Sequence, residues 1–479
     1  MPGGEVLPIH LAVCVALGIV IWVIPTPEGL ADNAWHLFAI FIATIVAIIV
    51  KAAPMGSLSI VAIALCAGTQ VLAPGDTSAS IGAALSGFAN ATIWLIVSAF
   101  FVARSVIKSG LGLRLAYLFV RIFGRNTLGL AYGLGLTDLA LSPFIPSNTA
   151  RAGGIVYPIT KSIAESAGSF TEDPKTHRKI GSYLALAGYN MNLAVSVVFF
   201  TGAAPNAMAA RFAMDEGIDV SWMGWLMAAV VPGMIGVILV PIVLYWVYPP
   251  EIKHTPEAPR EAARQLKSLG PITRSEWTTL AVFLLIIGLW IFGDSLFNAT
   301  TVAFIGLAAL LLGGALTWSD MKKEQAAWDT LVWFSALVMM GTYLNETGFI
   351  GWFGNGVGGW LADLGISHLM AFVLLTTVYA VAHYMFASGT AHTASMFSVF
   401  LVVGLALGLP GVPLVVFLGA IPTLMGCLTH YGNGPAPIYY GSGYVELKHW
   451  WSIGLGIGAM HLVIWLVVGT LWWNIIGVW

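Results

Sequence analysis

Long apolar runs with almost no charge constrain this chain more than any other feature. Of its 479 residues, 58% are hydrophobic and only 9% are charged, whereas soluble domains carry about 25% charged residues. Runs such as 35–50, 223–248 and 452–476 are long and apolar enough to cross a hydrocarbon core of about 30 Å as helices. A transmembrane β-barrel would instead show short segments of alternating hydropathy. The sequence therefore predicts an all-α polytopic membrane protein.

Charged residues, proline and glycine divide these runs into eleven predicted transmembrane helices. They cover residues 8–25, 35–50, 56–73, 84–108, 180–216, 224–248, 276–293, 298–316, 328–347, 413–447 and 452–477. Two further apolar stretches, 128–166 and 367–408, are too long for one crossing and carry a polar break at mid-length. Because non-helical backbone at membrane depth survives only where protein or a cavity satisfies it, we predict two re-entrant hairpins.

The basic residues support this layout, since cytoplasmic loops collect lysine and arginine. All 20 of them except Arg151 and Arg211 fall on one side of the predicted membrane. We therefore predict a multi-pass protein of the inner (plasma) membrane, with its amino terminus in the cytoplasm and its carboxyl terminus outside.

Composition and motifs argue against several other classes of protein. The net charge of −2 gives no basic bias toward nucleic acid, and the three cysteines all lie in apolar runs. Neither a disulfide framework nor a metal cluster is predicted. The sequence contains no H-E-x-x-H, no G-x-S-x-G and no Gly-Lys pair for a phosphate-binding loop. We expect no enzyme activity, no cofactor, no bound metal and no nucleic-acid partner.

The two halves of the chain resemble one another at an offset of about 240 residues. The breaks of the predicted hairpins read S-N-T-A from Ser147 and S-G-T-A from Ser388. Thr92 and Thr330 begin similar apolar runs that end at Gly110 and Gly348. An odd number of crossings separates the copies, so the repeat is inverted. Small residues also serve helix packing in membranes, so chance is the alternative; inverted repeats with broken helices indicate a secondary transporter.

A predicted broken helix follows each hairpin. Residues 180–216 are interrupted by TGAAPN, from Thr201 to Asn206, and residues 413–447 by THYGNGPAP, from Thr429 to Pro437. Pro146 and Pro205 stop a helix locally. Gly202, Gly389, Gly432 and Gly434 allow a ligand to approach the backbone closely.

The hairpin tips have the chemistry that binds carboxylates. A helix that starts at a tip leaves unpaired N–H groups and positive potential there, which suits an anion. The side chains of Ser147, Asn148, Thr149, Ser388 and Thr390 add hydrogen-bond donors. Two tips that meet from opposite faces could each hold one carboxylate of a rigid anion.

Two potential cations follow the tips at matching places, Arg151 and His392. An ionisable group inside a membrane is costly and is by default a functional candidate. A fixed guanidinium could offset substrate charge without any Na⁺, so we predict exchange of one anion for another. The alternatives are a structural ion pair between Arg151 and Asp138 and a neutral core histidine at position 392.

The tips and breaks resemble the divalent anion/sodium symporter (DASS) family. The motifs are SPFIPSNTARAGG, TGAAPN, FASGTAHTAS and GCLTHYGNGPAPIYYGSGYV, and the likeness is greatest to its citrate/succinate, tartrate/succinate and 2-oxoglutarate/malate exchangers. The resemblance implies an elevator-type homodimer with a scaffold (1–127 and 276–366) and a transport domain (128–248 and 367–479) joined by the cytoplasmic linker 249–275. It also implies a set of substrate-binding residues. These are Ser147, Asn148, Thr149, Thr201, Gly202, Pro205, Asn206, Ser388, Gly389, Thr390, Gly434 and Pro435.

The chain departs from the symporters of that family at one position. Gly389 stands where they have asparagine, which removes a side-chain amide and puts the second sodium site of the symporters in doubt. We therefore predict Na⁺-independent exchange of C4-dicarboxylates, citrate or 2-oxoglutarate. A Na⁺-coupled symporter is the first alternative and an anion channel the second. The preferred acid and the stoichiometry do not follow from the sequence.

Overall fold

Helices form wherever the chain is apolar, because an α-helix satisfies its own backbone hydrogen bonds in lipid. This computed structural model describes residues 6–293, 295–362, 365 and 367–479. Eight helical segments are long and apolar enough to cross a membrane. They are α2 (Asp32–Ile49), α5 (Ala91–Ser109), α12 (Trp222–Val247), α14 (Arg274–Phe292), α19 with η5 (His368–Met385), α20 (Gly389–Ala406), α21 with η6 (Gly411–Leu428) and α23 to α24 (Leu447–Ile475).

Other apolar helices are shorter or less apolar. The shorter ones are α1 (Pro8–Val23), α3 (Met55–Gly68), α7 (Thr127–Leu141) and α15 (Ala299–Leu312), and α17 spans Gln325–Glu346. The all-helical polytopic class is thus confirmed. Both α19 and α20, the predicted arms of one hairpin, have the length of a full crossing, so length alone does not separate re-entrant from spanning helices. The count of eleven spans stays a prediction.

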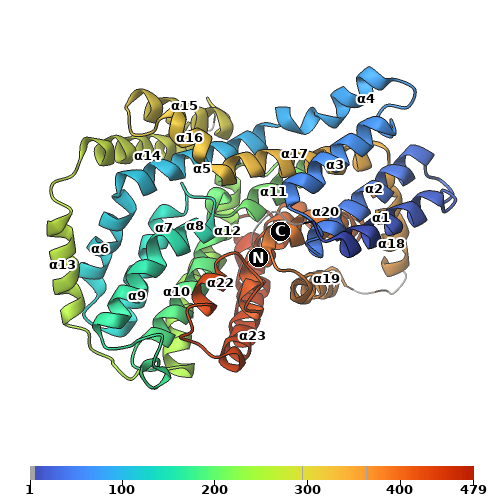
Figure 1. Cartoon of the computed structure of the whole chain (residues 1–479). Helices are drawn as coiled ribbons and strands as arrows, with labels where there is room; N and C mark the ends of the chain where they lie inside the picture. Colours follow the sequence, from blue (N-terminus) through green and yellow to red (C-terminus); the bar gives the residue numbers. More distant parts are fainter. Residues whose placement is uncertain (1–5, 294, 363–364, 366) are drawn as a thin grey trace.

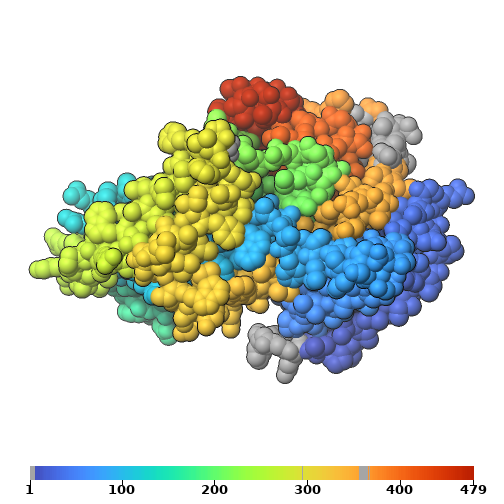
Figure 2. Space-filling model, turned by 90° about the horizontal axis from the view of Figure 1, so that it is seen from above, coloured from blue at the N-terminus to red at the C-terminus, as the bar shows by residue number. Residues whose placement is uncertain are grey.

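The helices are arranged in two layers, and each layer contains segments from both halves of the chain. In Figure 1 an upper layer lies across the top and right and consists of α1–α5, with α4 at Thr77–Ala84, and α14–α17, with α16 at Trp318–Lys323. A lower layer, which includes α7–α10, α12, α19, α22 and α23, lies below it. Figure 2 shows the N-terminal segments in blue beside the yellow and gold segments of α14–α17, with the red C-terminal segments along the opposite edge. In the upper layer α17 packs on α3 and α5, and in the lower layer α21 packs on α11 (Ala204–Met214) and α20. Such interleaving is expected of an internal repeat.

The helices are interrupted at the tips of both predicted hairpins and within both predicted broken helices. Between α7 and α8 (Asn148–Arg151) the chain is extended at Ser147; α8 continues through a π-helical turn (Ala152–Val156) into α9 (Tyr157–Ser166). The second interruption separates α19 from α20. The broken helices are α10 (Gly181–Ser196) with α11, and α21 with α22 (Ala436–Tyr440).

Three helices of more than ten residues lie in segments where no span was predicted. They are α6 (Leu111–Phe123), α13 (Glu257–Ser268) and α18 (Phe349–Ala362). Gly110 and Gly348 precede α6 and α18 with φ angles of 83° and 84°, a left-handed turn that glycine adopts without strain. The predicted linker 249–275 is therefore not a simple connection, because it contains α13, which packs on α6.

A polar cluster joins the two layers at the ends of α11 and α17. Arg211 donates to Asp215 (2.7 Å) and to the hydroxyl of Thr342 (3.0 Å). Thr342 in turn donates to the Asp215 carboxylate (3.1 Å), and the Asn345 amide donates to the Asp215 carbonyl. Elsewhere α11 meets α17 through aromatic contact, such as Phe212 against Phe334.

Candidate functional site

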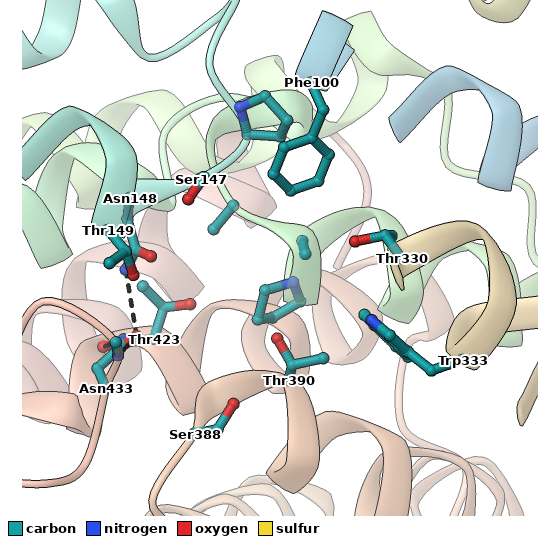
Figure 3. Close-up of a pocket in the computed structure, with 15 residues that line it drawn as sticks. Phe100, Ser147, Asn148, Thr149, Thr330, Trp333, Ser388, Thr390, Thr423 and Asn433 are labelled. Carbon is teal, nitrogen blue, oxygen red and sulfur yellow. Dashed lines mark hydrogen bonds between the residues drawn. The ribbon is translucent and has the colours of Figure 1, made fainter. Parts of the chain in front are cut away.

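The two tips converge on one cavity between the layers (Figure 3). Its volume is about 170 Å³, and both tips, both broken helices and the upper layer contribute to its lining. The lining residues are Phe100, Pro146, Ser147, Asn148, Thr149, Ala203, Ala204, Pro205, Thr330, Trp333, Ser388, Thr390, Thr423, Asn433 and Gly434. Asn148 and the residues that flank Gly389 thus face the same space, as the sequence predicts.

The serine at each tip caps the helix that returns from it. The Ser147 hydroxyl accepts a hydrogen bond from the Ala150 amide (3.1 Å), and the Ser388 hydroxyl accepts one from the Ala391 amide (3.5 Å). Both serines remain able to donate their own O–H. The first-turn amides that follow each cap have no intrahelical acceptor, so each tip presents donors and positive potential to the cavity.

The first tip also contacts the second broken helix. The Asn148 side-chain amide donates to the Asn433 side-chain oxygen over 3.3 Å, and the same oxygen accepts from the Gly434 amide at 2.8 Å. Gly434 is required here, because a Cβ at this position would lie 2.1 Å from the Thr149 hydroxyl. The two halves of the repeat are therefore in direct contact at the cavity floor.

Steric crowding explains why the second tip has glycine at position 389. A Cβ on Gly389 would lie 3.1 Å from the Pro422 carbonyl oxygen and 3.5 Å from the Pro205 ring. An asparagine side chain could not enter that space unless the backbone of α21 moved. Gly389 itself is buried beneath the cavity, and its neighbours Ser388 and Thr390 line it.

Besides Gly389, four predicted binding residues lie outside the cavity lining. Thr201 donates to the Pro143 carbonyl (2.6 Å), and Asn206 donates to the carbonyls of Ser196 and Phe199. The Gly202 carbonyl accepts from Arg151, and Pro435 caps the short α22. These residues shape the breaks, whereas Pro205 and Gly434 reach the cavity surface.

Arg151 is fully buried behind the first tip and does not line the cavity. Its guanidinium pairs with Asp138 (2.5 Å) and donates to the Gly202 carbonyl (2.7 Å), the Ser196 hydroxyl (2.6 Å) and the Ile145 carbonyl. The structure thus has the ion pair that was the alternative for this residue. Because Asp138 neutralises it, Arg151 offers no uncompensated charge to a bound anion in this arrangement.

His392 is also buried and outside the cavity lining. Its Nδ1 lies 2.9 Å from Nδ1 of His383, whose Nε2 lies 2.8 Å from the Gly432 carbonyl oxygen. A carbonyl only accepts, so in neutral rings His383 carries its proton on Nε2 and His392 donates from Nδ1. Nε2 of His392 then has no partner among the described residues. His392 therefore has the geometry of a hydrogen-bonded core histidine, which was the alternative to a charge-compensating role.

Sequence reasoning missed the wall that the upper layer contributes. Phe100 comes from α5, and Thr330 and Trp333 come from α17. Thr330 was noted only as a marker of the repeat. Asn433 lies within the predicted second break and was a detectable candidate, but Thr423 stands inside an apolar run with no local signal. No side chain that carries a formal charge at neutral pH lines the cavity.

Comparison with known proteins gives a consistent result over the whole chain. Residues 6–479 match the family model for the sodium:sulfate symporter transmembrane region. The chain is 50% identical to YflS of Bacillus subtilis, whose name proposes malate transport, over 98% of this chain and 97% of that protein. It is 44% identical to the chloroplastic dicarboxylate transporter 1 of Spinacia oleracea (100% and 82% covered) and 38% identical to the citrate/succinate antiporter of Escherichia coli (98% of each).

A solved structure supports the fold. The YdaH transporter of Alcanivorax borkumensis superposes with a TM-score of 0.58 at 14% identity, over 85% of this chain and 90% of that one. At this identity the similarity concerns the fold alone.

Proposed function

Because this chain belongs to the sodium:sulfate symporter (DASS) family, a family of transporters and not of enzymes, we propose that it carries small di- or tricarboxylate anions across its membrane. The relatives are named for malate, dicarboxylates and citrate/succinate. The predicted family is thereby confirmed. The carboxylates in the names of these relatives belong to the class of anion that the chemistry of the two tips favours.

One observation carries the substrate class. Two capped helix starts, with their free amides and serine hydroxyls, face a cavity that no acidic side chain lines. At about 30 Å³ per water molecule, the cavity of about 170 Å³ has the space of about six waters, which suits a small organic acid. One carboxylate would accept from the amides and hydroxyls at Ser147–Thr149, and the other from those at Ser388–Thr390.

We propose further that the transport is exchange without Na⁺. Backbone carbonyls of broken helices are the usual ligands of a coupling Na⁺. Here Arg151 donates to the Gly202 carbonyl in the first break, and His383 donates to the Gly432 carbonyl in the second. Protein N–H groups thus occupy acceptors that Na⁺ would need. The roles proposed for Arg151 and His383 are therefore to donate to backbone carbonyls at the breaks, with His392 hydrogen-bonded behind His383, rather than to touch the substrate.

The proposed movement is an elevator. The lower layer (128–248 and 367–479) would carry the tips and their acid past the scaffold (1–127 and 276–366), as the family likeness implies. Few polar contacts oppose such sliding. Among the described residues we find one group of side-chain hydrogen bonds between the two layers, the cluster of Arg211, Asp215, Thr342 and Asn345. A homodimer and a cytoplasmic amino terminus are part of the same proposal.

Purified protein in lipid vesicles tests the proposal. Labelled succinate should enter only vesicles preloaded with a dicarboxylate, at a saturable rate that is the same with Na⁺ or K⁺ outside. Uptake into empty vesicles that requires Na⁺ would establish the symporter instead, and a flux that never saturates would indicate a channel. Failure of succinate, malate, 2-oxoglutarate and citrate alike would overturn the substrate class.

A matched pair of variants tests the site. Ser388→Ala should raise the KM for succinate about tenfold, since a hydrogen bond to a charged group contributes about 1.5 kcal/mol or more. Ser395→Ala is the control: Ser395 lies on the same helix, bonds only to the carbonyls of Ala391 and His392, and does not line the cavity. Equal effects of the two substitutions would argue against binding at this tip.

A further inference from the structure

Trp333 lines both the cavity at the tips and a second, larger cavity. The outer cavity has a volume of about 570 Å³ and is lined by Pro54, Met55, Gly56, Ser57, Ile60, Asp329, Val332 and Trp333. Of these eight residues, Trp333 also lines the acid-binding cavity. Pro54, Ser57, Ile60 and Asp329 are exposed, so the outer cavity opens at the protein surface. One side chain therefore lines both the cavity at the tips and a space in contact with solvent.

The indole is held in this position by its surroundings. Trp333 is only 8% exposed and stacks against Phe334, with ring centroids 5.4 Å apart. In Figure 3 its ring nitrogen and the Thr330 hydroxyl point toward the cavity, on the side opposite Ser147 and Asn148. Thr330 donates to the Ala326 carbonyl one turn earlier in α17. The wall is thus part of a packed helix of the upper layer and not of the tips.

We propose that Trp333 is a specificity-determining gate for the carried acid. This inference rests on the proposed function. An acid held by the amides of the tips extends toward α17, and the rigid indole limits how long that acid can be. The indole N–H can donate a hydrogen bond but cannot accept one. It therefore also favours an acid that has a carboxylate at the end away from the tips. An acid that leaves through the outer cavity must pass the same ring.

Because the scaffold supplies this wall, its effect differs from that of the tips. The amides and serines would contact an acid throughout the movement, whereas Trp333 contacts it only while the lower layer is placed as in this structure. Loss of the ring at Trp333 should therefore change which acids enter from this side more than it changes the binding of the smallest acid.

Exchange measured with a panel of acids tests the gate. Trp333→Ala should raise the ratio of citrate to succinate uptake about tenfold, within the range that a few missing contacts change selectivity. Trp333→Phe keeps an aromatic wall but removes the N–H, so it should leave that ratio near its original value and raise the KM for succinate about fivefold. Trp333→Leu supplies the enlarged cavity if the alanine variant does not fold.

Trp328 provides the control on the same helix. It is half-buried, donates to the Met321 carbonyl (2.9 Å) and lines neither cavity, so Trp328→Ala should leave the citrate-to-succinate ratio unchanged. An enlarging variant at Trp333 that exchanges succinate with an unaltered ratio would overturn the gate and leave the transporter proposal intact. Absence of exchange in the unsubstituted protein would instead reject the proposed function.

Discussion

The two tips share a serine cap but have different support behind them. Each begins with a serine that caps the returning helix by accepting from the amide three residues later. Behind the first tip is a charged network of Arg151, Asp138 and the carbonyl of Gly202. Behind the second is an uncharged pair, His383 and His392, bonded to the carbonyl of Gly432. The repeat thus preserves the arrangement of donors at the cavity and not the chemistry that holds them in place.

The first prediction concerns the charged network, where the largest effect is expected. Asp138→Ala leaves the buried Arg151 guanidinium unpaired, which typically costs about 3–5 kcal/mol of stability. We expect a large fall in the thermal midpoint of the purified protein and no uptake. Asp138→Ala with Arg151→Met should recover much of the midpoint, because the uncompensated charge is gone. A midpoint that is unchanged in Asp138→Ala would contradict the contrast between the tips.

The second prediction concerns the uncharged pair. His383→Ala removes the donor to the Gly432 carbonyl and the acceptor for His392, and buried polar groups left unpaired cost about 1–3 kcal/mol each. The thermal midpoint should fall, but less than in Asp138→Ala. The same measurement on His461→Ala is a control, because His461 is buried on α23, does not line the cavity and has no hydrogen-bond partner among the described residues. A loss as large as that of Asp138→Ala would show that charge is not what distinguishes the tips.

A reciprocal exchange of tip residues should have an intermediate effect on transport. Asn148→Gly removes the amide that bonds to Asn433, and should raise the KM for succinate about fivefold. Gly389→Asn should do more harm, because its side chain would meet the Pro422 carbonyl. Uptake kinetics of both single variants and the double variant measure this asymmetry. If Gly389→Asn transports normally, the steric reason given for glycine is wrong.

The smallest effect is expected for an ion pair at the surface, between Lys108 on α5 and Asp320 on α16 (Trp318–Lys323). Partial burial raises the pKa of the Asp320 carboxyl, but hydrogen bonds from Lys108 and Thr317 outweigh it and hold the pKa at about 2. A carboxyl with a lowered pKa stabilises the folded state above its unfolded pKa of about 4, and the contribution disappears as the pH falls toward 2.

Asp320→Asn should therefore lower stability by less than about 1 kcal/mol at neutral pH. The difference in thermal midpoint from the unsubstituted protein should shrink as the pH is lowered from 5 to 2. A difference that is independent of pH would show that the carboxylate charge contributes nothing, and a loss as large as that in Asp138→Ala would remove the contrast between buried and exposed pairs.

Much of the local structure at the site could be predicted because residues that break or cap helices mark it in the sequence. Pro146, the capping serines and the glycines interrupt apolar runs, and each interruption lies where the structure breaks a helix. The helices α6 and α13 were not predicted, since charged residues, the two arginines of α6 and the alternating acids and bases of α13, interrupt the long apolar runs from which spans were counted. Their amphipathic character becomes informative only when each has the other to pack against.

The composition of the cavity wall could not be predicted for a different reason. Phe100, Thr330 and Trp333 reach the tips through the packing of two layers, and their neighbours in sequence look like those of any apolar helix. The same applies to Arg151 and His392. The sequence allowed either an exposed cation or a satisfied buried group at each position, and only tertiary contacts distinguish the two.

The neutral lining of the cavity has an electrical consequence. With the Arg151–Asp138 pair internally balanced, the only net charge that accompanies a swap at the tips is that of the acid itself. Trading two dianions would then be indifferent to membrane voltage. Exchange of a trianion for a dianion would move one elementary charge, worth about 2.3 kcal/mol per 100 mV, so the voltage across the bilayer would act together with the two concentration gradients in driving it.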